Sequence, residues 1–229
     1  MSRHLATLLV LLCAVLAVTS CASISVDDAS ASVRQNRPSM VYVMNFSTSD
    51  AEFDVDRTGA ALADFKSNLQ LMLRAGLVAE ITDKLVPAVA ETKLANPREP
   101  NAWLLRGEFT TVKQGSRLLR SAIGFGAGGT KLETRVQVYD LAQDPAAPFL
   151  TFSTTGGSNA EPGAILAFTT DPLQLAIGGV SGAAHGLSED TARTAREITA
   201  ELSDYMYARG WIPEDQRVES KHERATDTW

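Results

Sequence analysis

The stretch LETRVQVY, Leu132–Tyr139, decides how this chain folds. Its side chains alternate one by one between two kinds: Leu132, Thr134, Val136 and Val138 against Glu133, Arg135, Gln137 and Tyr139. Successive side chains of a strand point to opposite faces of a sheet. The alternation therefore predicts a strand with one face in a core and the other toward water.

Strands are also expected on both sides of this one. Ala102–Gly115 places Trp103, Leu105 and Phe109 at odd positions, and Phe149–Thr155 follows the turn sequence DLAQDPAAP. Together the three segments predict an antiparallel run. The apolar VYVMNF predicts a short buried strand where the folded domain begins, at Met40.

Helical spacing of apolar residues predicts three helical segments. One covers 58–75 with Gly76 as its stop, the next covers 77–94 with a break at Pro87, and the last begins at Ser188 as N-cap and ends at Gly210. A strand, then helices, then a meander predicts an α+β fold: a small, mostly antiparallel sheet with helices packed on one face, plus a C-terminal helix.

Length and charge restrict the class of protein. The chain has 229 residues, enough for one domain, which we place at 40–212, followed by a charged, loose tail at 213–229. Its 21 basic residues are outnumbered by 27 acidic ones and form no basic stripe. Nucleic-acid binding is therefore not expected.

The N-terminus has the pattern of a secretory signal. Arg3 precedes Leu5–Val18, which is apolar apart from Thr7 and too short to span a bilayer. The segment ends in Val18-Thr19-Ser20-Cys21, which resembles the lipobox of bacterial lipoproteins. The resemblance implies a signal peptide at 1–20 and a covalent lipid on Cys21, the first residue of the mature protein.

Residues 21–39 are then expected to form a flexible tether between the lipid and the domain. No aspartate follows Cys21, which in lipoproteins of Gram-negative bacteria resembles the pattern for the outer membrane. Cys13 leaves with the signal, so no disulfide is expected. The expected location is the bacterial cell envelope, most simply the outer membrane facing the periplasm.

The glycine run AIGFGAGGTK, 122–131, invites a nucleotide-binding interpretation. Gly124, Gly126 and Gly129 fit the spacing of a dinucleotide loop, but such a loop needs a helix directly after it, and here a strand is predicted. Thr130-Lys131 is also the wrong order for a P-loop. Nucleotide binding is not expected.

Around this run, RGEFTTVKQGSRLLRSAIGFGAGGTKLETRVQVYD resembles the core of an uncharacterised bacterial lipoprotein family known only as a domain of unknown function. The pattern is G-x-R-x-x-R-x-x-x-G-F-G-A-G, beginning at Gly115. The resemblance implies an envelope location and a small α+β domain, and it brings no catalytic residue.

Three groups in the sequence are candidate contact sites. Arg117 and Arg120 either bind a partner carboxylate or anionic headgroup, or form ion pairs with Glu108 or Glu133. The tip Ile123, Gly124, Phe125 and Gly126 is either an exposed apolar contact loop or tucked into the sheet. Gly178, Gly182 and Gly186, four residues apart, either mediate self-association or membrane contact, or pack within the domain.

Catalytic signatures are missing. Only His185 and His222 remain after cleavage, without metal-ligand spacing or a nucleophile motif, so no enzyme, metal or cofactor beyond the lipid is expected. The expected function is a lipid-anchored envelope protein that acts through contacts with an envelope protein or with copies of itself. The alternative is a module that binds a lipid or small amphiphile between the sheet and residues 163–187.

Overall fold

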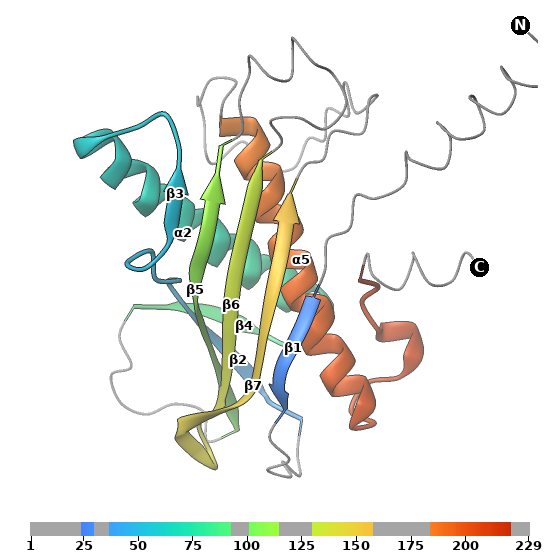
Figure 1. Ribbon diagram of the computed structural model, residues 1–229. Coiled ribbons are helices and arrows are strands. Elements are labelled where there is room, and N and C mark those ends of the chain that lie inside the picture. The colour runs from blue at the N-terminus through green and yellow to red at the C-terminus, as the bar shows by residue number, and fades with distance from the viewer. Residues whose placement is uncertain (1–23, 30–36, 93–100, 115–129, 158–183, 221–229) are drawn as a thin grey trace, which may run out of the picture.

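The computed structural model describes residues 24–29, 37–92, 101–114, 130–157 and 184–220. Within them a seven-stranded sheet carries two long helices (Figure 1). The elements are β1 Ile24–Ala29, β2 Met40–Met44, β3 Glu52–Asp54, α2 Gly59–Lys84, β4 Ala88–Glu91, β5 Ala102–Lys113, β6 Lys131–Asp140, β7 Asp144–Gly157, α5 Ala184–Ala208 and the 3₁₀ turn η1 Glu214–Gln216. The predicted α+β class is confirmed.

The strand order is β1-β7-β6-β5-β2-β4, with β3 paired to β5 beyond the end of β2. The long pairings β5–β6, β6–β7 and β1–β7 are antiparallel, as the predicted meander requires. The shorter pairings of β2 with β4 and β5, and of β3 with β5, are parallel. The sheet is therefore mixed, with its longer ladders antiparallel.

Strand β6 confirms most of the alternation seen in the sequence. Leu132, Thr134, Val136 and Val138 are buried on the helix side, whereas Glu133 and Gln137 are half-buried and Arg135 is exposed; Tyr139, expected on the water side, is buried. Thr134 is accommodated in the core because its hydroxyl lies 2.7 Å from the hydroxyl of Thr154 on β7, so each polar group satisfies the other.

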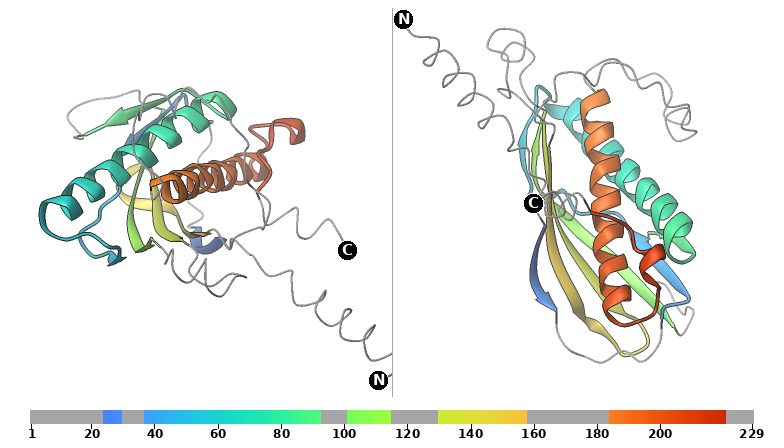
Figure 2. Two further views of the ribbon diagram at one scale, coloured as in Figure 1. Left: turned by 90° about the horizontal axis from the view of Figure 1, so that it is seen from above. Right: turned by 90° about the vertical axis from the view of Figure 1, so that its right-hand side faces the viewer.

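Both helices pack on one face of the sheet (Figure 2). Helix α2 continues through Gly76 to Lys84, so the predicted stop at Gly76 is wrong. A Cβ at Gly76 would lie 3.3 Å from Cβ of Ala195 in α5. The glycine serves helix packing, which outweighs its low helix propensity.

The predicted helix over 77–94 is correct only as far as Lys84, because the chain turns there and then becomes strand β4. Pro87 has no N–H to continue the helix. Thr82 closes the turn instead: its hydroxyl accepts a hydrogen bond from the Ala88 N–H at 3.0 Å. Leu85 and Val86 are buried beneath it.

Both ends of the domain differ from expectation. Ile24–Ala29, assigned to the flexible tether, is strand β1, and α5 begins at Ala184, four residues before the expected cap Ser188. Residues 213–220 dock on α5 and are not loose: Arg217 Nε donates to Asp204 Oδ1 at 2.7 Å and the Val218 N–H donates to Ser203 Oγ at 2.8 Å. In the part of the chain described, no helix combines the length and apolar character needed to cross a membrane.

Candidate functional site

Most residues singled out from the sequence lie outside the described residues. These are Cys21, Arg117, Arg120, the tip Ile123, Gly124, Phe125 and Gly126, and Gly178 and Gly182. Gly186 lies in the first turn of α5. The signal 1–20 and most of 163–187, the expected amphiphile site, are also outside.

A strand follows the glycines, as the sequence predicts: β6 begins at Lys131, two residues after Gly129. Glu133, one of two carboxylates considered for the arginine motif, contacts Lys131 Nζ at 2.7 Å. Among the described residues, no group of histidine, cysteine, aspartate and glutamate side chains could hold a metal ion.

The sheet face opposite the helices is covered by no described helix (Figures 1 and 2). Register pairs arrange its side chains in rows across the strands. One row is apolar and aromatic, running from Val89 through Tyr42 and Leu104 to Tyr139. The next rows are polar, since Arg106 opposes Gln137 and Glu108 opposes Arg135. We call this surface the open face.

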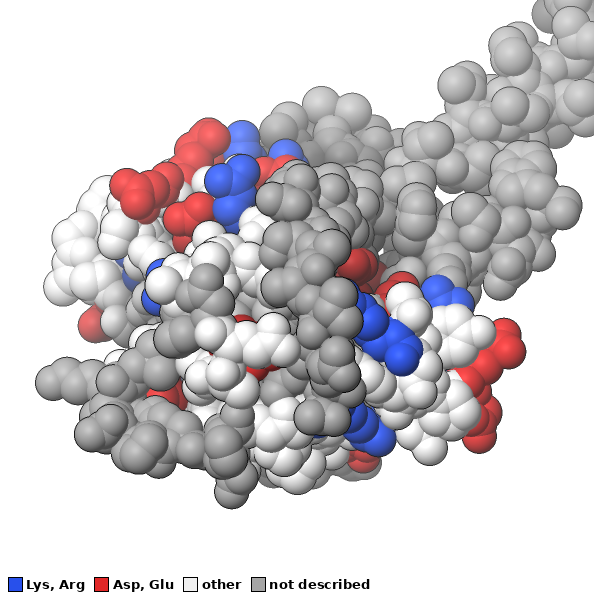
Figure 3. Space-filling view, turned by 90° about the horizontal axis from the view of Figure 1, so that it is seen from below, with Lys and Arg blue, Asp and Glu red and all other residues white. Residues whose placement is uncertain are grey.

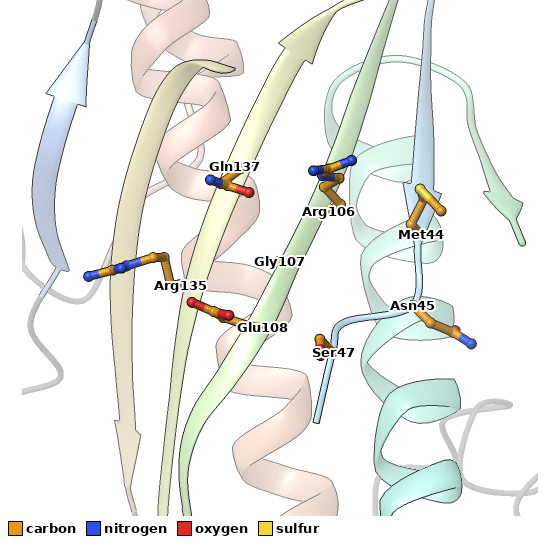
Figure 4. A pocket seen from close by; sticks show the side chains of 8 residues that line it. All are labelled: Met44, Asn45, Ser47, Arg106, Gly107, Glu108, Arg135 and Gln137. Atoms are coloured by element: carbon orange, nitrogen blue, oxygen red, sulfur yellow. The ribbon is translucent and has the colours of Figure 1, made fainter. Parts of the chain in front are cut away.

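A pocket of about 390 Å³ lies in the open face (Figure 4). It forms after Met44, where β2 ends and the chain separates from β5. The same segment pairs with β5 again at Ser47. There the Ser47 N–H donates to the Gly107 carbonyl and the Phe109 N–H donates to the Ser47 carbonyl, both at 2.8 Å. The lining residues are Met44, Asn45, Ser47, Arg106, Gly107, Glu108, Arg135 and Gln137.

This arrangement requires glycine at position 107, because a side chain would have no room there. An added Cβ would overlap the Arg135 carbonyl oxygen and lie 2.7 Å from Cε1 of Phe46. The Phe46 ring is fully buried on the helix side and packs against Phe109 with 6.0 Å between ring centroids. Its carbonyl accepts a hydrogen bond from Gln70 of α2 at 2.6 Å. The loop that borders the pocket is thereby fixed to the core.

Arg106 has a defined position in the pocket. Its guanidinium carbon lies 4.6 Å from the centroid of the Tyr139 ring, within range of a cation–π contact. The Tyr139 hydroxyl donates to Oε1 of Gln137 at 3.1 Å. The amide nitrogen of Gln137 is thus left to donate elsewhere.

Charges on the open face are unevenly compensated. Lys113 contacts Glu52 at 3.4 Å and Lys131 contacts Glu133 at 2.7 Å. Partial burial raises the pKa of Glu133, but hydrogen bonds from Lys131 and Thr111 and the nearby lysine charges outweigh it, so the pKa is lowered overall. Arg106 forms no ion pair with any described residue, and its register partner is the uncharged Gln137.

On the lower end of the molecule, basic and acidic side chains lie near one another (Figure 3). Sequence reasoning placed Arg135 and Gln137 on the polar side of a strand, but it missed Arg106, Ser47 and Asn45. The available signal was Gly107, an unexplained glycine inside a strand pattern.

Residues 41–179 match the family model described as Domain of unknown function (DUF4410). No curated protein matches the chain. Among solved structures, a PelC point-mutant dodecamer from Paraburkholderia phytofirmans shares 14% identity over 76% of this chain and 94% of its own, with a TM-score of 0.34.

A second PelC dodecamer structure from the same organism shares 12% identity over the same fractions, with a TM-score of 0.32. A candidate lipoprotein from Caulobacter crescentus CB15 shares 13% identity over 75% of this chain and 92% of its own, with a TM-score of 0.39. At these TM-scores the similarities carry no weight for the function of this chain.

Proposed function

Because the chain belongs to the DUF4410 family, a family of unknown function, we propose its function from the sequence and the site: a lipid-anchored protein of the bacterial envelope whose domain is a non-catalytic module that binds other proteins. The anchor is Cys21, and the binding surface is the open face.

One observation carries the proposal: the two described helices cover only one face of the sheet, while the opposite face carries rows of amide and charged side chains beside the half-buried Tyr42 and the exposed Val89. Aromatic and arginine side chains are enriched at protein interfaces, where they supply much of the binding energy. The pocket in this face is lined by one carboxylate, Glu108, and by no histidine or cysteine. Binding is therefore a better match than catalysis.

The lipid anchor is tested with an alkyne analogue of palmitate in bacterial cells. The wild-type chain should incorporate the label and sediment with outer membranes, whereas Cys21→Ala should lose both properties, because a thiol is required to accept the lipid. Labelling of Cys21→Ala equal to wild type would reject the anchor and the location that rests on it.

The binding surface is tested by photo-crosslinking in cells from Thr151, which opposes Gln137 on the open face. The control position is Ala75, on the exposed side of α2. Thr151 should give a discrete adduct with an envelope protein, or a dimer adduct if the partner is a second copy, and Ala75 should not. Lipid adducts alone, or no adduct from Thr151, would contradict binding through this face.

A further inference from the structure

We propose that the pocket at Arg106 binds the carboxylate of an acidic side chain on the partner protein, next to an apolar side chain that lies on Tyr42, Met44 and Val89. The inference rests on the proposed function and names the chemistry that the open face recognises. It places Arg106 at the centre of the contact.

The first reason is that Arg106 is held ready for an oxyanion. The guanidinium carbon lies 4.6 Å from the centroid of the Tyr139 ring. The guanidinium is planar, and its N–H groups point outward in its own plane. Arginine pairs with carboxylates through two parallel N–H donors in this plane. Stacking limits the motions of the side chain, so less conformational entropy is lost when a carboxylate binds.

The second reason is charge. Glu108 and Arg135 are opposite each other in the register of β5 and β6 but form no ion pair, and Arg106 forms none with a described residue either. The pocket, lined by two arginines and one glutamate, therefore carries one positive charge that a single carboxylate would neutralise.

The third reason is the set of hydrogen-bond donors near that charge. Gln137 uses its oxygen to accept from Tyr139, so its amide nitrogen is available to donate. Figure 4 shows Gln137 and Arg106 projecting from the adjacent strands β6 and β5, whereas the amide of Asn45 points away from them. Donors from two neighbouring strands suit a carboxylate, which accepts up to about four hydrogen bonds.

The fourth reason is the apolar surface beside the pocket. Val89 is 38% exposed on β4 and opposes the half-buried Tyr42, while Met44 lines the pocket itself. A partner segment that places an acidic side chain in the pocket would therefore place a nearby apolar side chain on this surface. The combination defines the recognised element as an acidic residue close to an apolar one.

The shape of the pocket favours a protein segment over a free small molecule. Asn45, Ser47, Arg106 and Arg135 are all exposed, so the pocket opens widely to solvent. Small-molecule sites usually bury about 70–90% of their ligand. A side chain that belongs to a docked protein needs less burial, because the rest of the interface contributes to binding.

The test is photo-crosslinking from Ser47 in the full-length, lipid-anchored chain in cells, with adducts identified and mapped by mass spectrometry. Ser47 is exposed and lines the pocket, and its hydroxyl hydrogen-bonds with Ser49. The crosslinked partner residue should lie within a few positions of an aspartate or glutamate. Arg106→Gln should lower the adduct yield by about tenfold or more, as expected for loss of a charged hydrogen-bonded pair.

Two further variants separate charge from general disturbance. Glu108→Gln removes the negative charge from the pocket and should raise the yield. Arg196→Gln makes the same substitution as Arg106→Gln at an exposed position of α5 and should leave the yield unchanged. Changing the mapped partner carboxylate to arginine should restore the adduct when it is combined with Arg106→Glu.

The outcomes also separate this inference from the proposed function. A protein adduct from Ser47 that keeps its yield in Arg106→Gln would overturn carboxylate recognition and leave binding through the open face intact. A partner segment that contains no acidic residue would have the same consequence. Lipid adducts alone from Ser47 and Thr151, or no adducts at all, would overturn both proposals.

Discussion

Gly76 of α2 and Ala195 of α5 form the close contact between the two helices: a Cβ at position 76 would lie 3.3 Å from that of Ala195. Both residues are buried, and the helices pack side by side over the core (Figure 2). The spacing between the helices therefore depends on a missing side chain.

Gly76→Leu should destabilise the domain. A branched side chain at this contact must separate α2 from α5 or adopt a strained rotamer, which typically costs about 1–3 kcal/mol. Chemical denaturation should show a lower midpoint, whereas Ala75→Leu, a similar enlargement at the exposed neighbouring position, should change it little. Equal stability of Gly76→Leu and wild type would mean that the helices are not in close contact.

Gly107→Ala should destabilise the domain and disturb the pocket together. The new methyl group meets the Arg135 carbonyl and the Phe46 ring, and the backbone oxygen cannot move without breaking the β5–β6 ladder. A loss of about 1–3 kcal/mol is expected for such overpacking. Phe46→Leu combined with Gly107→Ala should recover little, because the contact with the carbonyl remains. Full recovery in the double variant would assign the strain to the ring alone.

The central sheet was predictable because a half-buried antiparallel strand has a two-residue period that local sequence displays, as in Leu132–Tyr139. Strand β4 was not, because AVAE is too short to show a period and its identity depends on pairing with β2. The continuation of α2 through Gly76 was missed for a related reason. A glycine that ends a helix and one that admits a second helix look alike until the partner is known.

The candidate site shows the same limit. The outward direction of Arg135 and Gln137 follows from alternation, but the pocket depends on where β2 leaves β5 and on the return of Ser47. These are contacts between residues about sixty positions apart in the sequence, and no local pattern encodes them. Gly107 indicated an unusual position in the strand, but it did not predict the pocket beside it.

The hydroxyl pair of Thr134 and Thr154 can be tested by a double-mutant cycle. Thr134→Val leaves the buried Thr154 hydroxyl without its partner and should cost about 1–3 kcal/mol, and Thr154→Val should do the same. The double variant replaces both groups with methyls of the same shape and should lose less than the sum of the two. Strictly additive losses, measured by urea denaturation, would show that the two hydroxyls do not interact.

Glu201 on α5 should make stability fall as pH rises. Burial raises the pKa of this carboxyl, and the negative charge of Asp204 raises it further. Ionising Glu201 is therefore harder in the folded chain than in the unfolded one, so its contribution to stability is greatest below the unfolded pKa of about 4.3 and is lost as pH rises through the higher folded value.

Glu201→Gln cannot ionise, and it should accordingly match the wild-type Tm near pH 4 and exceed it near pH 7. In an Asp204→Asn background the gain at pH 7 should shrink without disappearing, because burial is the larger cause of the shift. Thermal unfolding of the four chains between pH 4 and pH 8 measures both effects. A Tm difference between Glu201→Gln and wild type that stays constant across this range would show that the carboxyl at position 201 ionises equally well in both states.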